Sequence, residues 1–505
     1  MNIRKITSLK ALIAKPYSKY IQRKIKSWAS NPVATQTKVF QELISKGSAT
    51  RFGEDHDFIS INNHNDFIKR VPVRDYEGIR SYVDRVVNGE EDVLWTGRPI
   101  YFAKTSGTTS GSKYIPITKD SMPSHVEAAR NAILMYVAET GNTRFVDGKM
   151  IFLQGSPILK EKNGINLGRL SGIVAHYVPK YLQKNRLPSW ETNCIDDWET
   201  KVEAIVDETI DQNMTVISGI PSWVQMYFER LIQRSNKKVG ELFENFQLFI
   251  FGGVNYEPYR SKFESMIGRR VDSIELYPAS EGFFAFQDKQ NEKGMLLLLD
   301  SGIFYEFIKA DEFFDDSPQR LTIGDVELGV NYVMIISTNA GLWAYNIGDT
   351  VSFTSKAPYR VVVTGRIKHF ISAFGEHVIG KEVEEAMKDG LDKVGGRISE
   401  FTVAPQINPN SGLPYHEWFV EFEKEPSSMI DFEKEIDKSL QNQNSYYFDL
   451  IEGSVLRPLK VTRVVSNGFN KYMESIGKLG GQNKLPRLSN DRAIADKLYE
   501  LNLVN

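Results

Sequence analysis

The sequence predicts an α/β protein with a large N-terminal domain of mixed sheets and helices and a small C-terminal α+β domain. A chain of 505 residues is too long for one hydrophobic core, so more than one domain is expected. A repeated strand–turn–helix pattern in the middle of the chain and a change of composition near Arg366 support this organisation. We therefore expect one domain at residues 1–366 and a second domain at residues 367–505.

The middle of the chain alternates helix-like and strand-like segments. Residues 194–212 have the apolar spacing of an amphipathic helix. Residues 214–235 predict a short buried strand, a turn at Gly219–Pro221 and a helix, and residues 246–267 repeat that plan. Residues 271–287 predict a further strand that runs into a loop. This rhythm is typical of a sheet covered by helices.

A different pattern follows toward the C-terminus. Antiparallel strands joined by turns are predicted within residues 296–308, 333–353 and 359–366. Beyond them, the predicted elements are a helix at 381–391, strands at 400–407 and 416–423, and a helix at 428–444. These last elements form an α+β module of ordinary domain size.

The composition excludes several classes of protein. Hydrophobic residues make up 41% of the chain and charged residues 25%, as in ordinary globular proteins. The formal net charge of −2 argues against nucleic acid as the main partner, because duplex binding usually requires a basic face. No stretch is apolar for the roughly 18 residues of a membrane span, and the N-terminus lacks the apolar core of a secretory signal. We expect a cytoplasmic monomer that acts on small molecules.

Cysteine usage fits a reducing compartment. Cys194 is the only cysteine, and the seven histidines show no metal-ligand spacing with it. The acids around Cys194 disfavour its thiolate, so we interpret this residue as structural.

The N-terminal segment, residues 1–28, contains no acid and many Lys and Arg residues. Its apolar residues recur at roughly helical spacing around Pro16. One interpretation is a basic amphipathic helix that docks on the protein through its apolar face. A second interpretation is peripheral contact with an acidic membrane surface.

The stretch "KTSGTTSGSKYIPIT", residues 104–118, follows an extended apolar segment and is rich in Gly, Ser and Thr. Its glycine and lysine spacing does not match a Walker phosphate loop, and the dinucleotide fingerprint G-x-G-x-x-G is absent. Glycines let backbone N–H groups turn toward an anion, and hydroxyls and Lys113 add donors and charge. From composition alone, the stretch is either a solvated connector or a loop that binds an anion.

Residues 106–113, "SGTTSGSK", resemble the pyrophosphate-binding loop S-G-T-T-G-x-x-K of the adenylate-forming enzymes. The second glycine, Gly111, is displaced by one residue. That displaced form resembles the acyl-acid amido synthetase family, the plant auxin- and jasmonate-conjugating enzymes and their bacterial relatives.

Further motifs occur in the order of that family and extend the resemblance over about residues 100–490. "FGGVNYEP" (251–258) resembles the adenine-pocket segment and "YPASEG" (277–282) the Tyr-Ala-Ser-Ser-Glu motif. "YNIGD" (345–349) resembles the Tyr-Arg-Val-Gly-Asp motif, "TGRIKHFISAFGEHV" (364–378) the hinge, and "GGQNKLPRL" (480–488) the C-terminal Gly-Gln-x-Lys-x-Pro-Arg segment. Pro278 and Asn346 depart from the family pattern.

The resemblance implies that ATP is a substrate and Mg²⁺ its counter-ion. The residues that would hold the β- and γ-phosphates are Ser106, Gly107, Thr108, Thr109, Gly111 and Lys113. The adenine slot would consist of Gly252, Gly253 and Val254, with Tyr277 stacking on the base. Ser280 would contact the α-phosphate, and Glu281 would bind Mg²⁺.

Residues of the later motifs would hold the ribose. Asp349 would accept hydrogen bonds from both ribose hydroxyls, with Tyr345 nearby, and Arg366 would reach the ribose or the α-phosphate. Each also has a structural interpretation: Tyr277 as a core aromatic, Asp349 as a turn residue, and Arg366 as an ion-paired linker residue.

The resemblance implies ATP-dependent activation of a carboxylic acid as an acyl-adenylate, followed by transfer to an amine, typically an amino acid. Lys484 would neutralise the reacting carboxylate and α-phosphate, and then leave as the C-terminal domain rotates. Glu376 or His377 would supply the base for amide formation.

The acyl pocket would be lined by His176, Tyr177 and Trp223, although the interpretation of these residues as core aromatics is favoured. Two other functions remain open. One is an acid–thiol ligase that passes the same adenylate to coenzyme A or a carrier, and the other is a non-catalytic nucleotide-binding scaffold.

Overall fold

The structure is a computed structural model with two compact units. It describes residues 9–106, 112–178, 183–195, 197–253, 256–367, 370–371, 378–407, 409–452, 456–479, 484–489 and 491–505. Unit 1 comprises Met1–Lys309, Asp315–Ile347 and Ser352–Val362, and unit 2 comprises Ala310–Phe314, Gly348–Val351 and Val363–Asn505.

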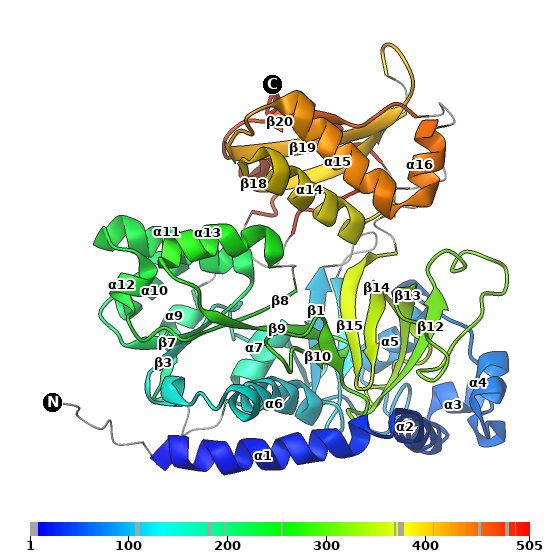
Figure 1. Ribbon diagram of the computed structural model, residues 1–505. Helices are drawn as coiled ribbons and strands as arrows, with labels where there is room; N and C mark the ends of the chain where they lie inside the picture. Colours follow the sequence, from blue (N-terminus) through cyan, green and yellow to red (C-terminus); the bar gives the residue numbers. More distant parts are fainter. Residues whose placement is uncertain are drawn as a thin grey trace. The chain divides into compact units, whose positions relative to one another are not determined.

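Most of an 11-stranded mixed sheet lies in unit 1 (Figure 1). Its strands in spatial order are β12 (Ile303–Lys309), β13 (Asn331–Thr338), β14 (Tyr345–Lys356), β15 (Tyr359–Arg366), β11 (Met295–Leu297), β10 (Gly282–Phe286), β9 (Asp272–Ala279), β8 (Leu248–Gly252), β7 (Met214–Ser218), β3 (Lys149–Phe152) and β6 (Arg186–Leu187). Strands β6, β3, β7, β8 and β9 run parallel, whereas β10 and β11 pair antiparallel with their neighbours. The sheet therefore combines a parallel α/β half with an antiparallel half.

A separate 4-stranded sheet has the order β2-β1-β5-β4. Its strands are β1 (Tyr101–Ser106), β2 (Ser112–Ile117), β4 (Lys160–Lys162) and β5 (Ile165–Gly168). Strands β1 and β2 form an antiparallel hairpin.

Helices surround both sheets. The helices of unit 1 are α1 (Leu9–Ala29), α2 (Pro32–Gly47), α3 (Arg51–Asp55), α4 (His64–Arg70), α5 (Tyr76–Val87), α6 (Met122–Thr140), α7 (Leu170–Ala175), α9 (Trp190–Asn193), α10 (Trp198–Thr209), α11 (Pro221–Ser235), α12 (Val239–Leu242) and α13 (Glu257–Ile267), with 3-10 turns η1 (Phe58–Ser60) and η2 (Arg144–Asp147).

The parallel half of the sheet is buried on both faces. On β8, Phe249 packs with α10, α11 and α13 in one hydrophobic cluster, whereas its neighbour Ile250 packs with α1 and α6 in another. On β7, Ile217 packs in the first of these clusters and Val216 in the second. Because successive strand residues point to opposite faces, a continuous apolar run produces a sheet with helices on each side. The predicted α/β fold class is confirmed.

One predicted element was wrong in its second half. Residues 271–287 form a hairpin, β9 and β10, rather than a strand that runs into a loop. The turn consists of Ser280 and Glu281, since Ala279 pairs with Gly282. All five residues of β10 are buried. The motif "SEG" therefore marks a tight reversal between β9 and the fully buried β10.

Unit 2 contains a 3-stranded sheet in the order β18-β19-β20. Its elements are β16 (Phe370–Ile371), β17 (Val378–Ile379), α14 (Gly380–Val394), β18 (Arg397–Gln406), β19 (Tyr415–Lys424), α15 (Met429–Gln443), α16 (Ser445–Glu452), β20 (Lys460–Val464), α17 (Gly468–Ser475) and α18 (Ala493–Glu500). Helices α14 and α15 pack on the sheet around Trp418. The predicted helix–strand–strand–helix order of this module is confirmed.

Irregular segments pair with both outer strands of this small sheet. Beside β18, Val403 N donates to Arg487 O at 2.9 Å and Ser489 N donates to Val403 O at 3.0 Å. Beside β20, Val464 forms an antiparallel bridge with Val504, and Asn505 N donates to Arg463 O at 2.9 Å. The last residues of the chain therefore belong to the sheet.

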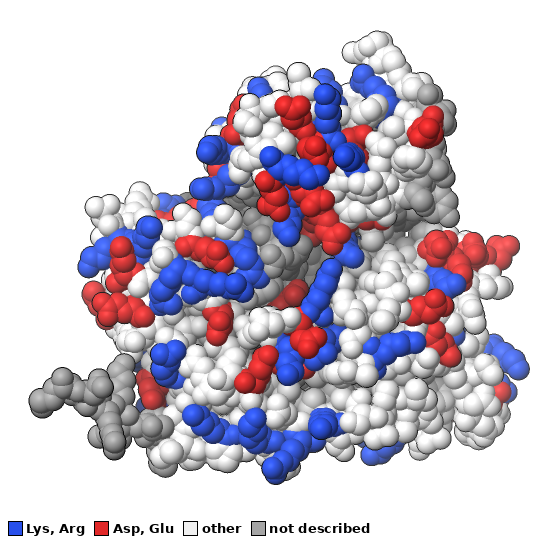
Figure 2. All heavy atoms as spheres, viewed as in Figure 1, with Lys and Arg blue, Asp and Glu red and all other residues white. Residues whose placement is uncertain are grey.

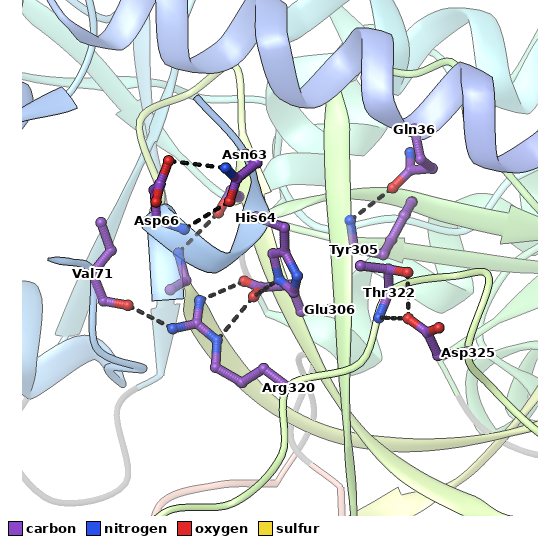
Figure 3. Close-up of polar contacts among 12 residues, drawn as sticks. Gln36, Asn63, His64, Asp66, Val71, Tyr305, Glu306, Arg320, Thr322 and Asp325 are labelled. Carbon is purple, nitrogen blue, oxygen red and sulfur yellow. Dashed lines mark hydrogen bonds and ion pairs between the residues drawn. The ribbon is translucent and has the colours of Figure 1, made fainter. Parts of the chain in front are cut away.

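Unit 1 also contains a polar triad of Glu306, Arg320 and His64 (Figure 3). Glu306 on β12 has no exposed side-chain surface, and its carboxylate accepts hydrogen bonds from Arg320 Nε at 2.8 Å and Nη2 at 2.7 Å. His64 Nε2 lies 2.7 Å from Glu306 Oε1. Burial alone would raise the pKa of Glu306, but Arg320 and His64 outweigh it and hold the pKa below its ordinary value. Arg320 Nη1 also donates to Val71 O at 2.6 Å.

The start of α14 carries a second buried carboxyl group. Glu382 Oε2 accepts hydrogen bonds from Ile379 N at 2.9 Å and Asn444 Nδ2 at 3.1 Å. Burial nevertheless raises the pKa of Glu382 from 4.5 to about 7. Because the folded protein holds the proton more tightly than the unfolded chain, this group's contribution to the free energy of unfolding falls as the pH rises from 4.5 to about 7.

We therefore expect α14 to be better protected from hydrogen exchange at about pH 5 than at about pH 8. The difference should be roughly 2 kcal/mol and should disappear in Glu382→Gln, which keeps an acceptor but does not titrate. Protection factors for the α14 amides, which correct for intrinsic exchange, provide the measurement. Equal wild-type protection at both pH values would contradict the expectation.

Candidate active site

The carboxyl ends of the parallel strands bring several predicted site residues to one edge of the sheet. Strand β8 ends at Gly252, and the next strand, β9, leads into the turn at Ser280 and Glu281. In open α/β sheets, ligands bind at this edge. A Cβ atom on Gly252 would lie 2.6 Å from Leu276 O, so glycine is needed there for close strand packing. Gly253 has φ +79°, a conformation that favours glycine.

The turn between β9 and β10 presents Ser280 and Glu281, and both are half-buried. Tyr277, three residues before the turn begins, is 7% exposed and meets the Phe284 ring edge-on at 5.0 Å. Tyr277 is therefore packed in the core, as its structural interpretation expected. At this end of the strand pair, Pro278 and the two turn residues remain accessible for a ligand.

The predicted phosphate loop lies in sequence between strands β1 and β2, which pair as a hairpin. The last residue pair of the hairpin is Ser106 with Ser112. Gly107, Thr108, Thr109 and Gly111 lie outside the described residues. Lys113 stands opposite Thr105 in the ladder, and its Nζ lies 5.5 Å from the centre of the Tyr76 ring. The hairpin thus holds the lysine on a strand directly beside the loop.

Asp349 and Arg366 lie together in unit 2. Arg366 Nε donates to Asp349 Oδ1 at 2.7 Å, and the Arg366 side chain is half-exposed while Asp349 is largely covered. Gly348, before Asp349, has φ +87°. The pair presents a guanidinium and a carboxylate side by side, which is a suitable combination for a ribose and a phosphate. Tyr345 at the start of β14 is 1% exposed and is a core residue.

Lys484 begins the segment that pairs with β18. The side chain of Arg487, three residues later, forms ion pairs with Glu384 and Glu400 and so fixes this segment within unit 2. Lys484 remains accessible to water, although protein atoms crowd around it. Desolvation lowers its pKa to about 8; Asp349 opposes this effect, and the charges of Arg366 and Arg487 add to it.

The three proposed acyl-pocket residues are not brought together. Trp223 on α11 is 5% exposed and belongs to the hydrophobic cluster beneath the sheet. His176 Nε2 lies 2.9 Å from Pro157 O, and its ring meets Trp190. The Tyr177 hydroxyl donates to the Tyr101 hydroxyl at 3.3 Å. Their contacts differ, so these residues do not form one described pocket.

Glu376, His377 and Val254, also predicted at the site, lie outside the described residues. A polar group that includes Gln154, just after β3, gave no recognisable signal in the sequence. In the described part of the chain, Gln154 Nε2 and Ser171 Oγ are buried and make no hydrogen bond. A Cβ atom on Gly155 would lie 3.0 Å from Arg169 Cδ and 3.6 Å from Ser171 Oγ, so these side chains gather at one point. Buried polar atoms of this kind usually meet water or a ligand.

The donors at this edge can be tested against the requirements of Mg²⁺. Among the described residues, no group of three or more His, Cys, Asp and Glu side chains could hold a metal ion. Mg²⁺ bound with a nucleotide usually takes one or two carboxylates, with phosphates and water completing its shell. Glu281, a single half-buried carboxylate on a tight turn, fits that requirement.

Three domain families match the chain. The GH3 family N-terminal domain matches residues 21–197, the central domain residues 296–366 and the C-terminal domain residues 381–493. Together these matches cover more than two thirds of the chain.

Curated relatives match over most of their length. Indole-3-acetic acid-amido synthetase GH3.15 from Arabidopsis thaliana is 21% identical, covering 94% of this chain and 93% of the relative. Jasmonoyl–L-amino acid synthetase JAR4 from Nicotiana attenuata is 20% identical, covering 63% of this chain and 66% of the relative.

Solved structures share the fold. The acyl acid amido synthetase AtGH3.15 in complex with 2,4-DB superposes with a TM-score of 0.78 at 16% identity, covering 97% of this chain and 96% of that one. A 2-hydroxyisobutyryl-CoA ligase in the postadenylation state gives a TM-score of 0.60 at 14% identity, covering 94% and 93%. The three domain matches and these relatives agree: the chain belongs to the GH3 family of acyl-acid amido synthetases.

Proposed function

We propose that this enzyme joins a carboxylic acid to an amino acid at the expense of ATP. In the first step, a carboxylate oxygen attacks the α-phosphorus of ATP, pyrophosphate leaves, and an acyl-adenylate forms. In the second step, an unprotonated amine attacks the acyl carbon, the bond to AMP breaks, and the amine proton passes to a base. The observation that carries the proposal is the match along 94% of the chain to a named amido synthetase.

In this proposal, ATP binds at the carboxyl edge of β8 and β9. The backbone at Gly252 and Gly253 faces the base, and Ser280 contacts the α-phosphate. The β1–β2 hairpin supports the phosphate loop, and Lys113 adds positive charge for the leaving pyrophosphate. Asp349 accepts hydrogen bonds from the ribose hydroxyls. Arg366, whose Nε lies 2.7 Å from Asp349 Oδ1, contacts the ribose or the α-phosphate.

Mg²⁺ held by Glu281 would neutralise phosphate charge when bound. We expect Glu281→Gln to raise the Mg²⁺ concentration that gives half-maximal pyrophosphate release by at least about tenfold, because the amide lacks the anionic ligand. Glu161→Gln, an exposed carboxylate on β4, is the matched control and should leave that concentration unchanged. Equal curves for Glu281→Gln and the wild type would remove Glu281 from the metal site.

We further propose that residues 1–366 form the adenylation domain and residues 367–505 a mobile domain that carries Lys484. Lys484 would offset the charge on the reacting carboxylate during the first step, and its withdrawal would admit the amine. Glu376 or His377 would accept the amine proton. The polar group at Gln154, Arg169 and Ser171 supplies donors for a substrate carboxylate. The single cysteine supports the cytoplasm as the proposed compartment, with the enzyme acting as a monomer.

A pyrophosphate-release screen tests the function. A panel of carboxylic acids is incubated with ATP and Mg²⁺ and crossed with amino acids or with coenzyme A, and products are identified by mass spectrometry. We expect at least one acid to release pyrophosphate and to give an amide with an amino acid. A thioester with coenzyme A and no amide would establish an acid–thiol ligase instead. ATP binding without pyrophosphate release for any acid would indicate a non-catalytic scaffold.

A further inference from the structure

Helix α1 is fixed to unit 1 by one of its faces. Ile21 is 4% exposed and Ile25 7%, and both pack in the hydrophobic cluster that includes α6. Lys19 Nζ donates to Ala138 O near the end of α6 at 2.9 Å. Figure 1 shows α1 lying beside α6 along the edge of unit 1. The docked interpretation of the basic N-terminal segment is therefore confirmed.

The opposite face of α1 carries a second set of apolar side chains. Exposed fractions are 59% for Leu12, 58% for Ile13, 38% for Tyr17 and 61% for Tyr20. At 3.6 residues per turn, Leu12, Pro16 and Tyr20 form one row, and Ile13 and Tyr17 form the next. The rings of Tyr17 and Tyr20 are stacked, with their centres 6.3 Å apart. We call these five residues the outer stripe.

Basic residues border the outer stripe on both sides. They are Lys15, Lys19, Arg23 and Lys26 on one side and Lys10 and Lys24 on the other. The helix contains no acidic residue. Figure 2 shows Lys and Arg side chains in a run along α1, separated by uncharged surface.

The surroundings neutralise only part of this charge. Lys15, Arg23 and Lys26 make no ion pair within the part of the chain that the structure describes. Lys24 lies within electrostatic reach of Asp300, which offsets part of its charge. The remaining positive charge flanks an apolar surface that α1 does not use for docking.

We propose that α1 binds the surface of a membrane rich in anionic phospholipids. The helix lies flat, with the outer stripe at the boundary between headgroups and acyl chains and the lysines beside lipid phosphates. An exposed apolar stripe with basic borders fits this interface. The acyl chains accommodate the apolar side chains, and the anionic headgroups attract the basic ones. Among the described residues, no helix has the length and apolar character needed to cross a bilayer, so the contact is peripheral. A nucleic acid would use the charge but not Leu12 and Ile13.

Vesicle co-sedimentation of the full chain at low salt tests the proposal. Vesicles of phosphatidylcholine alone are compared with vesicles that also contain phosphatidylglycerol. We expect at least about tenfold stronger binding to the anionic vesicles, falling as salt is added. Ile13→Ser with Tyr20→Ser should weaken that binding about tenfold, and Lys15→Gln with Arg23→Gln and Lys26→Gln at least as much.

Two matched controls replace the same residue types elsewhere. Ile59→Ser with Ile430→Ser removes apolar side chains that are 86% and 67% exposed, and Lys356→Gln with Lys388→Gln and Lys434→Gln removes three exposed charges. Both controls should bind like the wild type. Circular dichroism confirms folding, and pyrophosphate release without vesicles should be unchanged in all variants, so this test is independent of the proposed function.

Three results would overturn the proposal. Equal binding of the wild type to both kinds of vesicle would exclude recognition of anionic lipid. Full vesicle binding by Ile13→Ser with Tyr20→Ser would indicate that α1 binds any polyanion, including nucleic acid, through its charge alone. A dimer that depends on the outer stripe, with no vesicle binding, would identify a second copy of the chain as the occupant.

Discussion

Replacing Lys484 with Ala should lower acid-dependent pyrophosphate exchange by about 10²–10³-fold, because a positive charge beside the reacting carboxylate and α-phosphate acts mainly in the transition state. Amide formation from a supplied acyl-adenylate should change little, since the charge is not needed once pyrophosphate has left. Measuring the two half-reactions separately distinguishes these effects. Equal loss of both would show that Lys484 maintains the fold or both steps and does not act in adenylation alone.

The lowered pKa of Lys484 adds a pH test. With a pKa of about 8, the ammonium form declines as the pH rises above that value, so pyrophosphate exchange should fall on the alkaline side. Lys484→Arg keeps its charge at all these pH values. Its exchange rate, although lower at neutral pH because of altered geometry, should not show the alkaline fall. The same alkaline fall in Lys484→Arg would assign the titration to another group.

Replacing Glu306 with Ala should reduce the free energy of unfolding by about 3–5 kcal/mol, because the change leaves Arg320 buried without its carboxylate. The Arg320 side chain is 5% exposed, so water cannot replace that partner without rearrangement. Urea denaturation followed by circular dichroism gives the measurement. Lys46→Ala breaks the exposed ion pair between Lys46 and Asp120 and should cost about 1 kcal/mol or less.

A double variant separates the ion pair from a simple packing loss. Glu306→Leu with Arg320→Met fills the site with apolar side chains and should recover about half or more of the stability lost in Glu306→Ala. A double variant no more stable than Glu306→Ala would mean that packing around β12, or the orphaned Val71 carbonyl, dominates. Small losses in both would show that the interior accommodates the unpaired charge.

The fold was predictable because apolar periodicity reflects burial directly. The segments around β7 and β8 were recognised from continuous apolar runs, and the structure buries both of their faces. The turn at Ser280 and Glu281 was not recognised, because a two-residue reversal interrupts the apolar pattern too briefly. Its polar residues looked like the start of a loop.

The site was predictable only where chemistry and spacing coincide. The ion pair of Asp349 with Arg366 joins two motif residues 17 positions apart. Asp349 was predicted to contact the ribose, and Arg366 the ribose or the α-phosphate. The Glu306 triad gave no comparable signal. Its carboxylate interrupts an apolar strand, but its partner His64 lies 242 residues away in sequence. The acyl-pocket prediction took aromatic residues as lining, whereas Trp223 contributes to the core.

The paired edges of the small sheet in unit 2 have a consequence for aggregation. An open strand edge offers unpaired N–H and C=O groups to any other chain, and proteins commonly cover such edges. Here the backbone around Arg487 covers one edge, and the final residues from Leu503 to Asn505 cover the other. Removing those last residues would leave β20 open to strand addition by a second molecule. Leu503 to Asn505 therefore occupy an edge at which another strand could otherwise add.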